Sequence, residues 1–301
     1  MEPICFDMEP ICFKVPRQKE ETVRVEYWDL PYFYEPLHFH EECQLTYIIE
    51  SEGILFIGDK LDNFKKREIF LIGKNLPHVF RNDDSYYVQK SLHRARAISV
   101  FFSMDAFEAF FDKIPESYNL RKLLTNSTYG IRLGKTESRT IEPYMKKLLK
   151  LNGLPRVFEL LEILRLLSIS EDVHIMSTNT RLVLEEEDSV KLNKVFEFIM
   201  TNHRKRITLD EVASIVCMTP TSFCRFFKSR TQKTFTNFLI EVRISNACKL
   251  LTEKSYNVAE ACYSSGFNNI SNFHRHFLKV TGMTPIHYRR SAIKPKVSVY
   301  T

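Results

Sequence analysis

An internal repeat in the last third of the chain constrains the fold more than any other feature of the sequence. The stretches "LDEVASIVCMTPTSFCRFFKSRTQKTF" and "VAEACYSSGFNNISNFHRHFLKVTGMTP" align at an offset of 49 residues before a central turn and 50 after it. The matching pairs are Leu209/Val258, Ala213/Cys262, Met218/Phe267, Phe223/Phe273, Arg225/Arg275, Phe227/Phe277 and Thr234/Thr284. Each copy has the pattern of a helix, a tight turn and a second helix. The sequence therefore predicts two helix-turn-helix units, at about 208–230 and 257–280.

Each repeated position has a physical reason. Small side chains at Ala213 and Cys262 let the second helix of a unit approach the first. Gly266 can take a positive φ without strain in the turn. Phenylalanines at i and i+4 anchor the second helix of each unit inward. Thr208, followed three residues later by Glu211, predicts a capping box, and Thr219 before Pro220 predicts a second helix start.

The outer face of each second helix is polar and predicts contacts with DNA bases. Arg can bond guanine, Asn can bond adenine, and Ser or Thr adapts to either. The candidate residues are Thr221, Ser222, Cys224, Arg225 and Lys228 in the first copy, and Asn268, Ser271, Asn272, His274 and Arg275 in the second. The alternative is a pair of ordinary packed helices with solvated outer faces. His274 and His276 are not a metal pair, since positions i and i+2 face different sides of a helix.

The charge of the chain is divided unevenly along its length. Residues 191–301 carry 18 Lys and Arg against 6 Asp and Glu, a net charge of +12, whereas residues 1–190 carry 25 against 31, a net charge of −6. Such asymmetry is typical of a nucleic-acid-binding module joined to a domain with another partner. A basic membrane-binding surface is the alternative, but no Lys/Arg-rich amphipathic helix flanked by Trp accompanies the charge.

The first two thirds of the chain have a different pattern, so the predicted fold class is α+β with two domains. Short runs such as "CQLTYIIES", "REIFLIGK" and "ARAISVFFS" predict a small β-sandwich or barrel, and apolar residues at helical spacing from about Thr140 predict trailing helices. We expect an irregular segment at 1–19, a sensor domain at 20–175, a linker at 176–190, an all-α domain at 191–290 and a tail at 291–301. The repeated "MEPICF" at the start has no assigned function.

The C-terminal third resembles the AraC/XylS family of transcription regulators. The resemblance rests on "LDEVASIV", "FCRFFK", "FLIEVRISNACKLL", "VAEACYSSGFNNISNFHRHF" and "TGMTPIHYR", between about Leu192 and Arg290. It implies two helix-turn-helix subdomains joined by a long helix, with one recognition helix of each in the major groove. The chain departs from the pattern at Cys217 and Gln232, where glycine is usual, and at Leu278, where lysine is common.

The stretch "HFHEECQLTYIIESEGILFIGDKLDNFKKREIFLIGKNLPHVF" resembles the cupin barrel found in such regulators. The resemblance implies an effector pocket, for which the candidates are Tyr32, Tyr34, His38, His40, Gln44, Lys74 and His78. In metal-binding cupins, residues at the positions of His38, His40 and His78 bind a metal together with a carboxylate, but Gln44 occupies the carboxylate position. These three histidines are therefore candidates either for a divalent metal or for the polar lining of a pocket that has no metal.

The helices between Thr140 and Ser170 carry a leucine stripe with two readings. Its members are Leu148, Leu149, Leu160, Leu161, Leu164 and Leu167. The stripe predicts either packing against the sheet or a homodimer interface, and a homodimer agrees with the family resemblance.

The sequence as a whole predicts a sequence-specific DNA-binding regulator that responds to an effector and has no enzymatic activity. The alternative is a cupin-type metalloenzyme fused to a DNA-binding domain. The expected partners are an operator in double-stranded DNA, a small effector and, for an activator, RNA polymerase. Aromatic and amide groups would suit a sugar, whereas Lys74 would suit an organic acid. Seven cysteines without a CxxC pair and no apolar run of membrane-spanning length predict a cytoplasmic protein with free thiols.

Overall fold

The computed structural model describes residues 21–33, 37–88, 91–177, 186–252 and 256–293. The chain divides into two compact units, Met1–Val190 and Lys191–Thr301, and each is described by itself. Several predictions lie outside the described residues: the repeated start, Tyr34, most of the linker and the end of the tail. Among the described helices, none is both long and apolar enough to cross a membrane.

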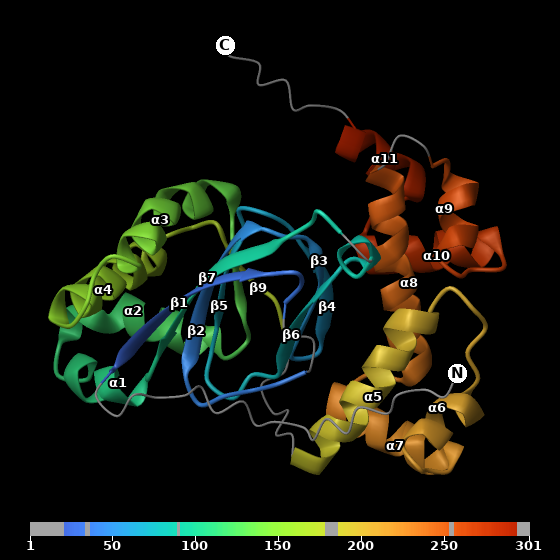
Figure 1. The fold of residues 1–301 in the computed structure, drawn as a ribbon, viewed down its shortest axis with the longest axis horizontal. Helices are drawn as coiled ribbons and strands as arrows, with labels where there is room; N and C mark the ends of the chain where they lie inside the picture. The colour runs from blue at the N-terminus through green and yellow to red at the C-terminus, as the bar shows by residue number, and fades with distance from the viewer. Residues whose placement is uncertain (1–20, 34–36, 89–90, 178–185, 253–255, 294–301) are drawn as a thin grey trace. The chain divides into compact units, whose positions relative to one another are not determined.

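The first unit contains two antiparallel sheets (Figure 1). Their strands are β1 (Val23–Leu30), β2 (Cys43–Glu50), β3 (Gly53–Ile57), β4 (Lys60–Phe64), β5 (Ile69–Ile72), β6 (His78–Asn82), β7 (Ala95–Phe102), β8 (Ile131–Leu133) and β9 (Val173–Ile175). The larger sheet has the order β1-β7-β2-β5-β8-β9, and the smaller one has the order β4-β3-β6.

Alternation along the strands gives the larger sheet two apolar faces. On β2, Leu45 and Tyr47 point to one face and Ile48 to the other, as the period of two requires. The first face packs against helices α1 (Asp105–Phe111), α2 (Tyr118–Ser127), α3 (Lys135–Leu148) and α4 (Leu154–Ser168). The second face packs against the smaller sheet, and its core includes Leu55 of β3 and Phe64 of β4.

The predicted cupin barrel is not confirmed, because the hydrogen-bonded ladders leave two separate sheets. One isolated bridge, between His38 and His78, joins the segment before β2 to the smaller sheet. The two-domain α+β organisation agrees with the prediction.

The leucine stripe on α3 and α4 belongs to the core. Leu148, Leu160, Leu164 and Leu167 are at most 1% exposed and pack with the strands. Leu161 is half-buried against the same core, and Leu149 is 39% exposed. Core packing therefore accounts for the stripe except at Leu149, and its possible role in a homodimer stays a prediction.

Seven described helices lie wholly or mostly in the second unit. They are α5 (Glu186–Asn202), α6 (Leu209–Ile215), α7 (Pro220–Thr231), α8 (Phe235–Thr252), α9 (Val258–Ser264), α10 (Ile270–Thr281) and α11 (Pro285–Ile293). The pairs α6/α7 and α9/α10 are the two helix-turn-helix units, and α8 lies between them in the chain. The predicted capping box of Thr208 and Glu211 is confirmed, and so is the cap of Thr219.

Aromatic side chains form the core on both sides of α8. Phe223 and Phe227 of α7 pack against Phe235 and Phe238 of α8, with ring centroids 5.5–5.8 Å apart. Phe273 and Phe277 of α10 belong to the second cluster with Ala247 and Leu251 of α8 and Phe267. Phe223, Phe227, Phe273 and Phe277 are all fully buried. Each recognition helix is thus fixed by its inner face, and its outer face is left to solvent.

Candidate nucleic-acid interface

Nine of the ten residues predicted to contact DNA lie on α7 and α10, and Asn268 lies in the turn just before α10. All ten are exposed except His274, which is half-buried beside the ring of Phe273. Both helices are twelve residues long, and both begin with a side chain that caps the first turn. The Thr219 hydroxyl accepts a hydrogen bond from the Ser222 backbone N–H at 3.3 Å, and Asn269 Oδ1 accepts one from the Asn272 N–H at 2.9 Å. The exposed faces therefore start from equivalent, fixed helix ends.

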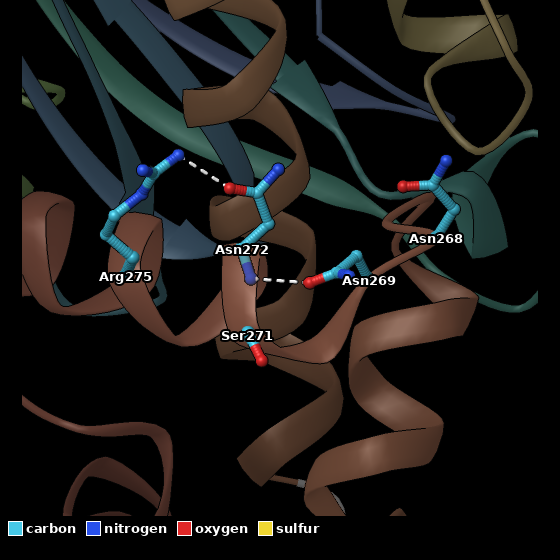
Figure 2. A pocket seen from close by; sticks show the side chains of 5 residues that line it. All are labelled: Asn268, Asn269, Ser271, Asn272 and Arg275. Atoms are coloured by element: carbon cyan, nitrogen blue, oxygen red, sulfur yellow. Dashed lines mark hydrogen bonds between the residues drawn. The ribbon is translucent and has the colours of Figure 1, made fainter.

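The first turns of α10 contain a hydrogen-bonded pair of side chains. Arg275 Nη2 donates to Asn272 Oδ1 at 2.6 Å (Figure 2). The pair lines an open hollow of about 620 Å³ together with Asn268, Asn269 and Ser271. Every lining side chain is polar, and Arg275 is the only one with a charge. Such a surface offers hydrogen-bond partners to the edge of a base pair or to a phosphate.

The equivalent surface on α7 is organised differently. Ser222 stands where α10 has Asn272, and its hydroxyl accepts a hydrogen bond from the cap hydroxyl of Thr219 at 3.0 Å. Among the described residues, none forms a side-chain hydrogen bond or ion pair with Arg225. Cys224 is exposed as a free thiol, and Lys228 adds a charge where α10 has the exposed Leu278. The α7 face therefore has more charge and less internal hydrogen bonding.

The turns within the two units differ in what they require. Cys217 and Gly266 both adopt positive φ, 53° and 92°. A Cβ on Gly266 would lie 2.4 Å from the backbone oxygen of His203 and 2.9 Å from Cα of Arg204. Gly266 is therefore required by a close backbone approach as well as by its φ. In the first helix-turn-helix unit Cys217 stands in place of glycine and the turn is still formed. The residue is then held in the left-handed region, which is strained for a residue with a Cβ.

Arg243 of α8 lies beside the turn at Gly266 and bonds to the segment that precedes the first helix-turn-helix unit. Its Nε donates to the carbonyl of His203 and its Nη2 to the carbonyl of Lys205, both at 2.7 Å. Its guanidinium is half-buried, and this burial lowers the pKa of Arg243 from its ordinary value. The long helix α8, through Arg243, thus fixes the segment before α6 beside the turn of the second helix-turn-helix unit.

The helix ends after α7 and α10 are equivalent despite the second departure from the family pattern. Gln232 and Gly282 both take the left-handed conformation, with φ of 57° and 71°. The Gln232 side chain donates to the carbonyl of Ser229 at 2.9 Å. A Cβ on Gly282 would meet no atom within 4 Å, so glycine serves only the backbone conformation there.

The N-terminal unit, Met1–Val190, contains a second candidate site, which is a buried polar cluster. Four of the predicted effector residues come together in it: His38, His40, Gln44 and His78. His40 Nε2 and His78 Nε2 each lie 3.0 Å from Gln44 Oε1, and the ring centroids of His38 and His78 are 4.4 Å apart. Two other candidates lie elsewhere: Tyr32 packs against Tyr87, and Lys74 forms an ion pair with Asp105 at 3.0 Å.

Two residues of this cluster were not predicted from the sequence. Thr46 Oγ1 lies 2.7 Å from the Gln44 amide and 3.0 Å from Ser99 Oγ, so the hydrogen bonds continue across β2 and β7. Thr46 was detectable, because strand alternation places it on the same face as Gln44. Ser99 could not be predicted in this way, because its place in the cluster depends on the register of β2 and β7, in which it stands opposite Thr46.

Burial fixes the protonation of the two inner histidines. Desolvation lowers the pKa of His40 and lowers that of His78 well below its usual range, and the neighbouring His38 and His40 add to the effect on His78. Each neutral ring has one N–H, and the Nδ1 atoms lie 2.9 Å from the Glu42 carbonyl and 2.8 Å from the Leu76 carbonyl. These carbonyls take the protons, and both Nε2 lone pairs face the centre of the cluster.

Two arrangements satisfy those inward lone pairs. The Gln44 amide can present its NH₂ group to both nitrogens while its oxygen accepts from Thr46. Alternatively a divalent metal can bind them, because ligand atoms of His38, His40 and His78 all lie within 4.8 Å of one another. Nδ1 atoms bound to carbonyls are the usual outer contacts of histidine ligands. The residues therefore fit a three-imidazole site for a first-row metal, with a neutral amide as the fourth group.

The tandem units, with their exposed polar recognition helices, define a DNA-binding protein of the double helix-turn-helix class. A family model described as a helix-turn-helix domain matches residues 212–291. A helix-turn-helix transcriptional regulator encoded in the cgkA 5′ region of Pseudoalteromonas carrageenovora is 34% identical over 140 residues, which are 41% of this chain and 83% of the relative. The chain belongs to the AraC family of helix-turn-helix transcriptional regulators.

Further similarities include the following two. The helix-turn-helix transcriptional activator RhaR of Mannheimia succiniciproducens is 24% identical over 273 residues, covering 91% of this chain and 92% of the relative. Among solved structures, the DNA-binding domain of AdpA in complex with a target DNA is 26% identical. It covers 34% of this chain and 91% of that domain, with a TM-score of 0.32.

Proposed function

We propose that the chain is a transcription regulator in which each protomer reads two adjacent major-groove segments, one with α7 and one with α10. The observation that carries the proposal is the pair of recognition helices, each fixed by two fully buried phenylalanines and each presenting an exposed polar face. The net charge of +12 on residues 191–301 would supply the attraction to phosphates. Recognition helices that follow one face of B-DNA lie about 34 Å apart.

Selection of DNA fragments tests this function directly. Purified protein is incubated with sheared DNA of its source genome, and the retained fragments are sequenced. We expect a recurrent motif in two blocks separated by about one helical turn. Affinity for it should fall steeply with salt, by roughly 10³–10⁵ between 50 and 200 mM for six to ten phosphate contacts. Retention of fragments without any shared motif would contradict the proposal.

We propose that the N-terminal unit controls this binding through a small effector, and that the cluster of His38, His40, Gln44 and His78 makes the polar contacts with that effector. Buried hydrogen-bonding groups in an apolar surrounding are typical of small-ligand sites, and a sugar is the first effector class to test. Lys74 is less suited than its sequence position suggested, because it pairs with Asp105. A homodimer would double the number of recognition helices. An activator of this kind would also contact RNA polymerase, and would act in the bacterial cytoplasm, where the DNA is.

A stability measurement tests the effector site. Sugars and organic acids are added to the full chain, and its thermal unfolding is followed with and without each compound. A bound ligand raises the midpoint by mass action. The same compound should lose its effect in Gln44→Leu and should change the affinity for the selected DNA. A compound that binds without altering DNA affinity would argue against a regulatory role of the site.

A metal-dependent activity is the second candidate function, because the three imidazoles could hold a first-row divalent ion. His38, His40 and His78 would be the ligands, and the ion would supply Lewis acidity. Metal analysis of the purified protein distinguishes the two functions. One equivalent of metal that is lost in His78→Ala would favour the second, whereas a regulator that binds its operator after treatment with a chelator would favour the first.

A further inference from the structure

Asn272 and Arg275 form a hydrogen-bonded pair on the exposed face of α10, in the second helix-turn-helix unit. The residues are three positions apart on α10, so their side chains lie on the same exposed face. The Arg275 guanidinium donates one of its five N–H groups to Asn272 Oδ1 at 2.6 Å. The bond orients the planar guanidinium relative to the helix (Figure 2), and its other donors have no partner among the described residues.

The pairing changes the chemistry that Asn272 offers. An asparagine that reads adenine must accept from the N6 amino group and donate to N7, and therefore needs its oxygen and its NH₂ together. In this structure one of the two lone pairs on that oxygen already accepts from a charged donor. The groups that the pair still offers are mostly N–H donors: those left on Arg275 and those of the Asn272 amide. Guanine is the base with two acceptors in the major groove, O6 and N7.

The surroundings favour a base edge over a phosphate as the partner of this pair. Residues near the N-terminus of a recognition helix are those that contact base edges, and the pair lies in the first two turns of α10. The hollow beside it is lined by Asn268, Asn269 and Ser271, which carry no charge and would suit the edges of neighbouring bases. The first turn itself is held by the Asn269 cap and by fully buried Phe273.

We propose that α10 selects guanine through Arg275, and that Asn272 is a positioning residue for the guanidinium rather than a reader of adenine. The inference rests on the proposed function, since it assigns a base to one of the two recognition helices. It also implies that the two helix-turn-helix units differ in how strictly they select a base, because Ser222 does not hold Arg225 as Asn272 holds Arg275.

Selection from a randomised duplex library tests the assignment with the full-length protein. The wild type, Arg275→Lys, Asn272→Ala and the matched control Asn268→Ala are each used to select a motif. We expect the wild-type motif to contain one guanine whose preference over the other bases is about 5- to 150-fold, the factor that corresponds to 1–3 kcal/mol for a bidentate contact. Arg275→Lys should abolish that preference, Asn272→Ala should reduce it, and Asn268→Ala should leave it unchanged.

A modified base then tests the contact at the level of single atoms. Replacement of that guanine by 7-deazaguanine removes N7 and should weaken wild-type binding without weakening Arg275→Lys further. An adenine that depends on Asn272 and is indifferent to Arg275→Lys would overturn the assignment. So would an equal loss for all sequences with a smaller salt dependence, which is the mark of a phosphate contact. The absence of any wild-type motif would instead overturn the proposed function, and this inference with it.

Discussion

The two helix-turn-helix units share a plan but meet its requirements with different residues. Their helices begin with equivalent caps and are anchored by equivalent phenylalanines, whereas their turns and polar faces differ. The first turn contains Cys217, and the second requires Gly266 because the chain near His203 passes within contact distance. On the first polar face Arg225 has no side-chain partner among the described residues, whereas on the second Arg275 is held by Asn272. A repeat in sequence therefore does not imply equal tolerance to substitution or equal stringency toward DNA.

The largest expected difference concerns the turn residues. In Gly266→Ala, the new Cβ meets backbone atoms of His203 and Arg204 in a left-handed conformation, and we expect a loss of about 2–5 kcal/mol in the free energy of unfolding. Cys217→Ala is the matched control and should change it by less than about 1 kcal/mol, because a Cβ is already present. Urea unfolding followed by circular dichroism at 222 nm measures both.

The fluorescence of the only tryptophan, Trp28, serves as an internal control, because Trp28 packs in the N-terminal unit and reports on the folding of that unit. It should be unchanged in both variants. Equal losses of stability in the two variants would show that the turns have the same requirements, against the comparison made above.

Arg243 should have the next largest effect, because it links the second turn to the segment before α6. Arg243→Met retains much of the side-chain volume and removes two charge-assisted hydrogen bonds to the carbonyls of His203 and Lys205. We expect a loss of about 2–3 kcal/mol, since one of the bonds is partly buried. Hydrogen exchange should show faster opening in both helix-turn-helix units. Faster exchange confined to α9 and α10 would argue that Arg243 does not couple them.

Ser222→Asn would transfer the side-chain pair of α10 to α7. The new amide stands three residues before Arg225, and it should raise the preference for guanine at the base that Arg225 contacts by about fivefold, or roughly 1 kcal/mol. Ser222→Ala controls for the loss of the hydroxyl. Binding of duplexes that differ at that one base measures the change. An unaltered preference would indicate that the pair by itself does not set the stringency.

The smallest effects are expected at the helix ends, where the two units are equivalent. Gln232→Gly should raise the free energy of unfolding by about 0.5–1 kcal/mol, because glycine adopts the left-handed conformation without strain. Gly282→Ala should lower it by a similar amount, since no atom lies near enough to clash. Thermal midpoints of the two variants should therefore shift in opposite directions. A large loss in Gly282→Ala would reveal a contact like that of Gly266.

The sequence predicted much of this fold because its signals are local. The capping box at Thr208, the cap at Thr219 and the phenylalanines at i and i+4 depend only on neighbouring residues, and all are present in the structure. The second cap was also within reach, since the 50-residue offset carries Thr219 to Asn269. The two-domain organisation followed from the change in charge and in apolar period.

The features that the sequence could not supply are contacts between distant segments. The clash that fixes Gly266 arises from residues about sixty positions earlier, and the pairing of Lys74 with Asp105 removes it from the polar cluster. The leucine stripe had two equally good readings in the sequence, and the structure places all of its members except Leu149 in or against the core. The hydrogen bond from Arg275 to the Asn272 oxygen likewise depends on the rotamers of the two side chains, which their identities alone do not determine.

The central claim is that both units of one chain read DNA sequence, and footprinting on a selected site tests it most directly. Hydroxyl-radical protection of the site is compared for the wild type, Arg225→Lys and Arg275→Lys. We predict two protected blocks about one helical turn apart on one face of the duplex, with each substitution weakening only its own block. A single protected block that is lost only in Arg275→Lys would contradict the claim, because α7 would then have no part in recognition.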